Sequence, residues 1–96
     1  MAAQKAVADL GTTESRIDDM RSHPQNRTIA DIDWLLCGQA GCNKRPGKGS
    51  HFVYKHPTIS KAGGFASVVI PFNRPIKEWY VRKALEYHDA LKEEME

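Results

Sequence analysis

Apolar side chains in residues 28–41 recur with the period of a helix. They stand three or four positions apart and fall on one helical face, at Ile29, Ile32, Leu35 and Leu36. Thr28 is expected to cap the first turn, with Asp31 three residues on completing a capping box. Gly38 and Gly41 are expected to end the helix. Because the helix dipole accounts for Asp31 and Asp33 near the N-terminus, we assign these carboxylates no catalytic role.

Three short extended segments follow, each bounded by turn residues. They are Cys42–Arg45, Ser50–His56 and Phe65–Phe72. The run Pro46–Gly49 suits a hairpin turn, and Pro57 stops the second segment. Because short connections join antiparallel neighbours, we expect two antiparallel hairpins.

Two more helices are expected, one on each side of this region. The last starts at Asn73–Pro75, where proline suits the first turn, and has an apolar stripe at Trp79, Tyr80, Ala84, Tyr87, His88 and Leu91. A short helix begins after a Thr12 or Thr13 cap and ends before Pro24. It has few apolar residues, so we expect it to lean on the domain, with the Ala-rich run Met1–Gly11 as a frayed lead-in.

The order of elements predicts an α+β fold of the form α-α-β-β-β-α. In such a fold a three-stranded antiparallel sheet has its helices packed on one face and leaves the other face open. We expect residues 1–26 to be an N-terminal extension with a short helix, and residues 27–96 to form the functional domain.

Alternation along the second strand predicts which side chains reach the open face. The two sets are His51, Val53 and Lys55 on one side, and Phe52, Tyr54 and His56 on the other. The second set is bulkier and suits the helix-packed core. We therefore expect His51 and Lys55 on the open face together with the basic residues of the hairpin, and Val53 on a partly covered part of it.

Composition limits the kind of site that this chain can hold. Its 96 residues suffice for one small domain with a thin core, which favours a site on an open sheet over a deep cofactor cleft. No apolar run reaches the roughly 20 residues that span a bilayer, and the N-terminus lacks the layout of a secretory signal. Cys37 and Cys42 are the only cysteines and suit a reducing compartment. We expect a cytoplasmic protein without a cofactor.

Charge is distributed unevenly, although the net formal charge is only +2. Between Lys44 and Lys83 there are nine Lys and Arg residues and a single acidic residue, Glu78, whereas the rest of the chain is acidic. Such clustering is typical of proteins that bind a phosphate backbone, with a weakly basic surface that binds nothing as the alternative.

His51 is the residue in this basic half that is best suited to chemistry on RNA. RNA carries its own nucleophile in the ribose 2′-hydroxyl, so cleavage needs a base, an acid and positive charge near the phosphate. Histidine as a residue type has an unperturbed pKa of about 6.5 and serves in both protonation states. Lys48 or Lys55 would stabilise the developing charge, and the Gly47 and Gly49 backbone could approach a phosphate closely. The second acid/base group is not named by the sequence, so we expect a slow enzyme or one completed by substrate or water.

Three stretches of the chain together resemble a known family. They are Gly49–Pro57 (Gly-Ser-His-Phe-Val-Tyr-Lys-His-Pro), the strand Val68–Pro71, and Asn73–Lys77 at the start of a helix. In this pattern the chain is similar, over roughly residues 28–91, to the HicA family of bacterial mRNA interferase toxins. The resemblance implies a fold like that of double-stranded-RNA-binding domains, ribosome-independent cleavage of mRNA, and His51 as catalytic residue. It also implies a cognate HicB-type antitoxin that covers the active site.

These observations define a candidate site and two functions. His51 is the candidate catalytic residue, and the candidate RNA-binding residues are Lys44, Arg45, Lys48, Gly49, Ser50, Lys55, Arg74 and Lys77. No metal ligand is assigned. The first function is a metal-independent endoribonuclease toxin, and the alternative is a non-catalytic RNA-binding module that uses the same basic face.

The motifs allow two other interpretations. Cys37, Cys42, His51 and His56 have a spacing that superficially resembles a zinc finger. Residues five apart in a strand lie about 16 Å apart on opposite faces, so the two histidines are not expected to share one ion. Trp79 and Tyr80 could stack nucleobases, but packing of the last helix is the favoured use, and His56 and His88 are expected to be structural.

Overall fold

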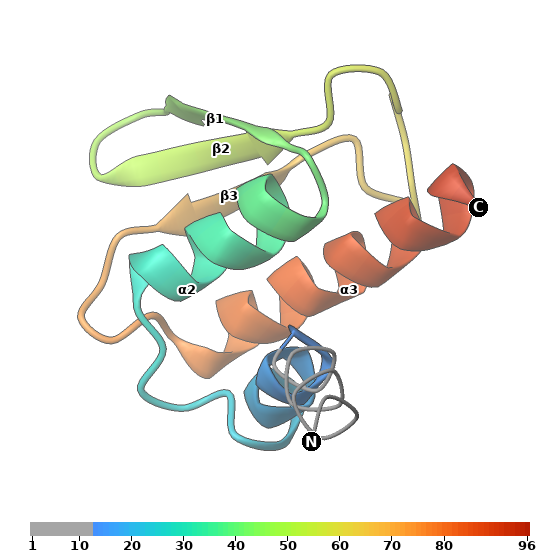
Figure 1. Ribbon diagram of the computed structural model, residues 1–96. Coiled ribbons are helices and arrows are strands. Elements are labelled where there is room, and N and C mark those ends of the chain that lie inside the picture. The colour runs from blue at the N-terminus through green and yellow to red at the C-terminus, as the bar shows by residue number, and fades with distance from the viewer. Residues whose placement is uncertain (1–12) are drawn as a thin grey trace, which may run out of the picture.

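The structure, a computed structural model, describes residues 13–96, so the expected lead-in Met1–Gly11 lies outside the described residues. After a helix over residues 13–22, the elements are α2 (Ile29–Asp33), η1 (Trp34–Gln39), β1 (Asn43–Pro46), β2 (His51–Lys55), β3 (Val68–Pro71) and α3 (Glu78–Met95). Figure 1 shows the helices gathered on one side of a three-stranded antiparallel sheet. The predicted α+β fold class is confirmed. No helix within residues 13–96 is long and apolar enough to cross a membrane.

The second helix starts where the sequence predicts and ends later. The Thr28 side chain accepts a hydrogen bond from the Asp31 backbone, and the Asp31 carboxylate accepts one from the Thr28 N–H at 2.9 Å, which confirms the capping box. The helix does not end at Gly38, because α2 continues into η1, a π-helical segment. Gly41 has a φ of +79° and terminates the element in the left-handed region that glycine adopts easily.

The segment before β3 folds into a turn of its own. Ala62 and Phe65 each donate a backbone hydrogen bond to the other, at 2.9 and 2.8 Å. Gly63 and Gly64 between them have φ values of +57° and +85°, as two-residue hairpin turns require. Phe65 packs its ring edge-on against Tyr87 at 5.8 Å. The strand therefore begins at Val68 and not, as predicted, at Phe65.

The last helix begins later than predicted. Pro75 is not in its first turn, because Ile76 donates its N–H to the Arg27 carbonyl at 2.8 Å in an isolated β-bridge. This bridge holds the chain extended as far as Lys77, the N-cap, with φ −64° and ψ 140°. Ile76 is 1% exposed, so its burial anchors the segment between the sheet and α3.

The apolar stripe of α3 is confirmed except at its start. Its buried residues are Val81, Ala84, Leu85, Tyr87, His88 and Leu91. Tyr80 packs against the core at the margin of this stripe. The expectation that Trp79 packs in the core is wrong, because its side chain is 60% exposed. It precedes Val81 by two residues and so points about 200° away around the helix.

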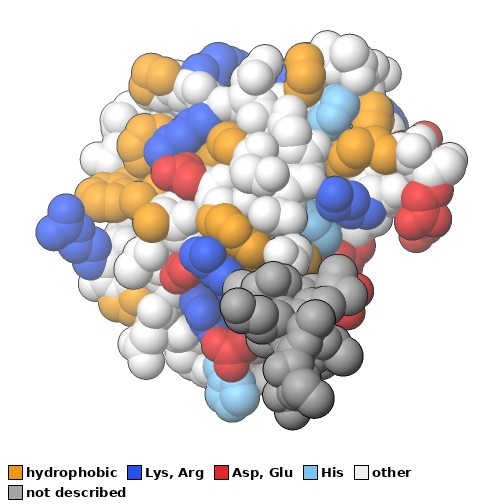
Figure 2. Space-filling view, viewed as in Figure 1, with side chains coloured by type: hydrophobic (Ala, Val, Ile, Leu, Met, Phe, Trp, Pro, Cys, Tyr) orange, Lys and Arg blue, Asp and Glu red, His pale blue; other side chains and the backbone are white. Residues whose placement is uncertain are grey.

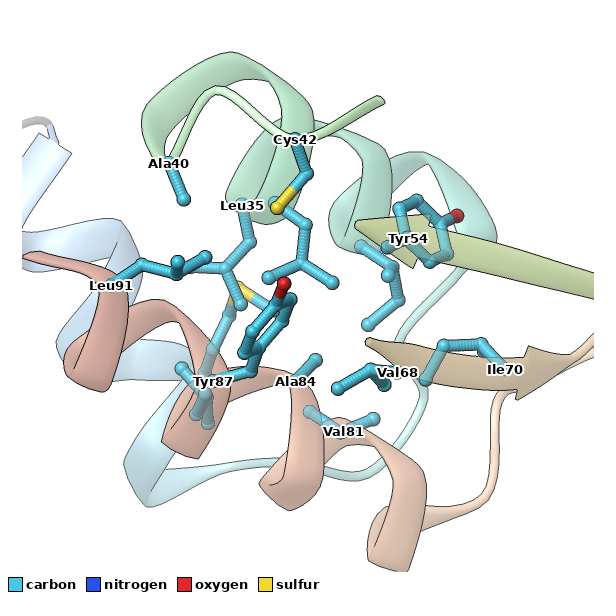
Figure 3. Packing of buried hydrophobic residues seen from close by; sticks show 14 of the residues in the cluster. Leu35, Ala40, Cys42, Tyr54, Val68, Ile70, Val81, Ala84, Tyr87 and Leu91 are labelled. Atoms are coloured by element: carbon cyan, nitrogen blue, oxygen red, sulfur yellow. The ribbon is translucent and has the colours of Figure 1, made fainter. Parts of the chain in front are cut away.

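One hydrophobic core joins the helices to the sheet. Figure 3 shows Leu35 of η1, Tyr54 of β2 and Tyr87 of α3 in the same cluster, and all three are fully buried. Met20 from the helix of residues 13–22 is also fully buried in it. That helix therefore leans on the domain as expected, whereas a domain boundary at residue 26 stays a prediction.

Candidate active site

The strand register defines the residues on the open face of the sheet. Directly paired residues of antiparallel strands project to the same face. The open face therefore carries Asn43 and Arg45 from β1, His51, Val53 and Lys55 from β2, and Val69 and Pro71 from β3. His51 and Lys55 are exposed, whereas Tyr54 on the helix side is fully buried. The predicted division of β2 between the two faces is confirmed by the register, but Val53, expected to be partly covered, is buried at 8% exposure.

The turn between β1 and β2 fixes the position of His51. The Gly47 N–H donates to the His51 carbonyl at 2.8 Å, and the His51 N–H donates to the Lys48 carbonyl at 3.2 Å. Gly49 has a φ of +60°. A Cβ at Gly47 would lie 3.2 Å from a methyl group of Val53. The two glycines therefore let a tight turn pass close to the strand that bears the histidine.

The imidazole of His51 is held in one orientation and one tautomer. Its Nδ1 lies 2.8 Å from the Lys48 carbonyl oxygen. A carbonyl oxygen can only accept, so Nδ1 carries the proton of this hydrogen bond. In the neutral ring Nε2 is then the unprotonated nitrogen, on an exposed side chain. Such a nitrogen can take a proton from a hydroxyl group and later return it to a leaving oxygen.

Cations without a carboxylate partner surround this part of the sheet. Within residues 13–96, Arg45, Lys48 and Lys55 form no ion pair, whereas Lys44, Arg82 and Lys83 do. Arg45 and Lys55 line a hollow of about 300 Å³ on the open face. Lys55 stands four residues from His51, about 13 Å along the strand, so it would contact a neighbouring phosphate.

Lys44 lies on the helix side of the sheet. It pairs with Tyr54 in the ladder, its Nζ is 3.0 Å from Asp33 Oδ2, and it lies 4.2 Å from the centre of the Phe52 ring. The expectation that Lys44 shares a face with His51 is therefore wrong. A step of one residue along a strand reverses the face, so the adjacent cation Arg45 is the one on the open side.

Asp33 does more than interact with a helix dipole. Its Oδ1 accepts a hydrogen bond of 2.6 Å from the Tyr54 hydroxyl. Burial raises the pKa of Tyr54 above its ordinary value, and the hydrogen bond to Asp33 raises it further. The phenol therefore stays protonated and acts as a donor that ties α2 to β2. The sequence did not indicate this link, because its partners are 21 positions apart.

The remaining candidates lie at the end of the sheet where β2 begins. Ser50 is exposed in the turn, and its carbonyl accepts a 2.7 Å hydrogen bond from the Phe72 N–H. Arg74 and Lys77 are in the segment between β3 and α3, and the Arg74 guanidinium lies 5.3 Å from the centre of the Phe72 ring. Neither therefore lies on a strand of the open face, and Lys77 is the N-cap of α3.

His56 has a structural role and the opposite tautomer. It is buried, and its Nδ1 accepts hydrogen bonds from the backbone N–H groups of Thr58 and Ile59, at 3.1 and 3.0 Å. Because His51 is on the other face of β2, the two imidazoles cannot ligate one ion. Burial raises the pKa of the Cys42 thiol to about 11, which disfavours the thiolate that binds zinc. Over residues 13–96, no three His, Cys, Asp or Glu side chains gather as metal ligands.

The charge on the open face is of one sign. None of the residues that the three strands place there is acidic. On the face seen in Figure 2, by contrast, basic and acidic side chains lie next to each other. An exposed, oriented histidine beside unpaired cations can exchange a proton with a hydroxyl group next to a bound phosphodiester. None of the strand residues on that face supplies a carboxylate.

No family model, no curated protein and no solved structure matches this chain.

Proposed function

We propose that the protein is a HicA-type mRNA interferase, a metal-independent endoribonuclease with His51 as its general acid/base. The observation that carries the proposal is the hydrogen bond from His51 Nδ1 to the Lys48 carbonyl, at 2.8 Å. It leaves Nε2 of an exposed imidazole able to accept a proton, on a sheet face whose only charged side chains are basic.

The reaction needs no water in its first step. Nε2 of His51 takes the proton of a ribose 2′-hydroxyl, and the 2′-oxygen forms a bond to the adjacent phosphorus. The bond from phosphorus to the 5′-oxygen of the next nucleotide breaks, and that oxygen receives a proton from the imidazolium, either directly or through a water molecule that takes the imidazolium proton in exchange. The products are a 2′,3′-cyclic phosphate and a 5′-hydroxyl, and the histidine is returned to its starting state.

The cations and the turn supply the rest of the catalysis. Charge accumulates on the phosphoryl oxygens during attack, and a fixed positive charge nearby lowers the barrier. Lys48 precedes His51 in the same turn, so its ammonium is the cation we assign to the reacting phosphate. Arg45 and Lys55 bind the neighbouring phosphates through the hollow that they line.

The same face suits a protein inhibitor. We propose that a HicB-type antitoxin covers it in the cytoplasm, where the mRNA substrate is found. Such a partner would bury Val69, which is 46% exposed on the open face. Val69→Asp is expected to weaken a complex with such a protein, and an unchanged affinity would contradict this part of the proposal.

The reaction is tested with an RNA that lacks the 2′-hydroxyl group at one nucleotide. An oligonucleotide with a single 2′-deoxynucleotide on the 5′ side of the cleaved linkage is expected to resist cleavage there, in the presence of chelator. The all-ribose oligonucleotide is expected to give a cyclic phosphate by mass spectrometry. Cleavage at the deoxynucleotide, or a 5′-phosphate product, would overturn the proposed chemistry. RNA binding without any product would favour the non-catalytic module.

A further inference from the structure

A second hollow lies at the end of the sheet where β2 starts. Its volume is about 440 Å³, and its lining includes Ile29, Ala30, Phe72, Asn73 and Arg74. This volume falls within the roughly 300–1,000 Å³ of typical ligand pockets, which are mostly apolar with a few polar groups. The sequence did not single this place out, because its walls come from two segments more than forty positions apart.

The hollow adjoins the proposed active site. His51 and Pro71 are partners in the ladder, and the next residue, Phe72, donates its N–H to Ser50 at 2.7 Å. Figure 1 shows the start of α2, the start of β2 and the end of β3 at the same end of the molecule. Phe72 projects to the helix side, since it alternates with Pro71 on the open face. An RNA strand bound at His51 would reach the hollow by passing over the end of the sheet.

The chemistry of the lining fits a flat, aromatic ligand with polar edges. The Phe72 ring and the Arg74 guanidinium lie 5.3 Å apart, and single-stranded bases stack on both kinds of plane. Asn26 and Asn73 are exposed at the lining, and each amide offers a donor and an acceptor side by side. The single charged side chain of the lining, Arg74, is positive and suits the phosphate of the same nucleotide.

We propose that this hollow binds one unpaired nucleobase of the RNA that His51 cleaves, and so sets the position of cleavage. The proposal rests on the proposed function for the identity of its ligand. A base held here anchors the strand beside His51, which explains how a protein with a shallow open face can place one phosphodiester at Nε2.

The test uses two separate changes: a protein variant whose side chain fills the hollow, and an RNA that lacks one base. Ala30 is exposed on α2, so Ala30→Tyr places a ring in the hollow without removing core packing. Ala66→Tyr is the matched control, because Ala66 is exposed and precedes β3, at the opposite end of that strand from Phe72. Both substitutions are combined with His51→Ala, so that the RNA is not cleaved. The probe is a single-stranded RNA octamer, either intact or abasic at one position, with each position tested in turn. Fluorescence anisotropy measures the affinity of each variant for each octamer.

Ala30→Tyr is expected to weaken binding of the intact octamer about fivefold to a hundredfold, and Ala66→Tyr to leave it unchanged. One abasic position is expected to weaken binding similarly, with no further loss in Ala30→Tyr, because both changes remove the same contact. Asn73→Ala, a change in an exposed loop, is expected to give a smaller loss at that same position. Equal binding by the Ala30 and Ala66 variants, or losses that add, would overturn the base site.

The outcome is independent of catalysis. If RNA binding shows these losses but the wild-type protein never cleaves RNA, the base site would be supported and the proposed function contradicted. Cleavage that depends on His51 but is indifferent to Ala30→Tyr, in rate and in position, would sink the base site alone.

Discussion

The imidazole Nδ1 of His51 and the backbone carbonyl of Lys48 lie 2.8 Å apart, and this contact determines which nitrogen of the ring can act as a base. Its geometry depends on the turn between the two residues. Gly49 has a φ of +60° there, and a Cβ added to it would lie 4.0 Å from His51 Nδ1.

Gly49→Ala is therefore expected to lower the rate of RNA cleavage, because it distorts the turn that orients His51. Forcing an L-residue into the left-handed region costs about 1–2 kcal/mol, which shifts the turn or destabilises the fold. Gly64→Ala is the matched control, since Gly64 has a φ of +85° with open space around it, in a different turn. Both variants should unfold at a lower urea concentration than wild type. Under conditions where both are folded, only Gly49→Ala should cleave RNA more slowly. Equal rates would contradict the role of the turn.

Lys55 and Lys44 are expected to differ in their effect on RNA binding. Lys55→Ala removes a cation of the open face, so the slope of log K against log salt should fall by about 0.7 for single-stranded RNA. Lys44→Ala should leave this slope unchanged and cost about 0.5–1 kcal/mol of stability, because Lys44 pairs with Asp33. Titrations at four salt concentrations distinguish them, and a loss of slope in Lys44→Ala would mean that RNA binds the helix side.

Tyr54→Phe is expected to destabilise the protein without affecting the open face. The change leaves the Asp33 carboxylate without its 2.6 Å hydrogen bond, and a lost bond to a charged group costs about 1–3 kcal/mol. Tyr80→Phe, a partly buried tyrosine on α3, serves as control. Urea denaturation measures both. A Tyr54→Phe protein as stable as wild type would show that the hydrogen bond contributes nothing.

Acid is expected to loosen the contact between the N-terminal helix and α3. Partial burial raises the pKa of Asp89, but hydrogen bonds from Arg21 and His88 outweigh it, so the pKa lies below its ordinary value. The unfolded chain then binds the proton at higher pH than the folded one, and the stabilisation, complete above about pH 4, is lost as pH falls through the lower, folded-state pKa. Asp89→Asn should flatten this acid dependence of the urea midpoint. An unchanged slope would contradict the assignment.

Local patterns were sufficient to predict the class of fold and the face that carries His51. The capping box of Thr28 and Asp31 is a motif of four consecutive residues. The alternation of β2 follows from the backbone geometry of any strand. The start of α3 could not be predicted this way. It depends on the bridge between Ile76 and Arg27, which are far apart in the sequence and meet only in the folded chain.

The candidate site was only partly predictable, because some of its residues are placed by local patterns and others by contacts between distant segments. His51, Lys48 and Lys55 follow from one strand and its turn, whereas the face of Lys44 depends on where β1 pairs with β2. A shift of register by one residue would have reversed Lys44 and Arg45. The hollow at Phe72 has no local signal, since the approach of α2 to the end of β3 creates it.

The central claim is that His51 transfers protons in RNA cleavage, and one comparison of variants tests it most directly. Cleavage of RNA by purified protein in the presence of chelator is measured for wild type, His51→Ala and His23→Ala, with folding checked by circular dichroism. His23 is an exposed histidine that pairs with Asp19 and lies outside the three strands. We expect His51→Ala to cleave at least about a hundredfold more slowly and His23→Ala to match wild type. A folded His51→Ala protein that cleaves at the wild-type rate would contradict the account.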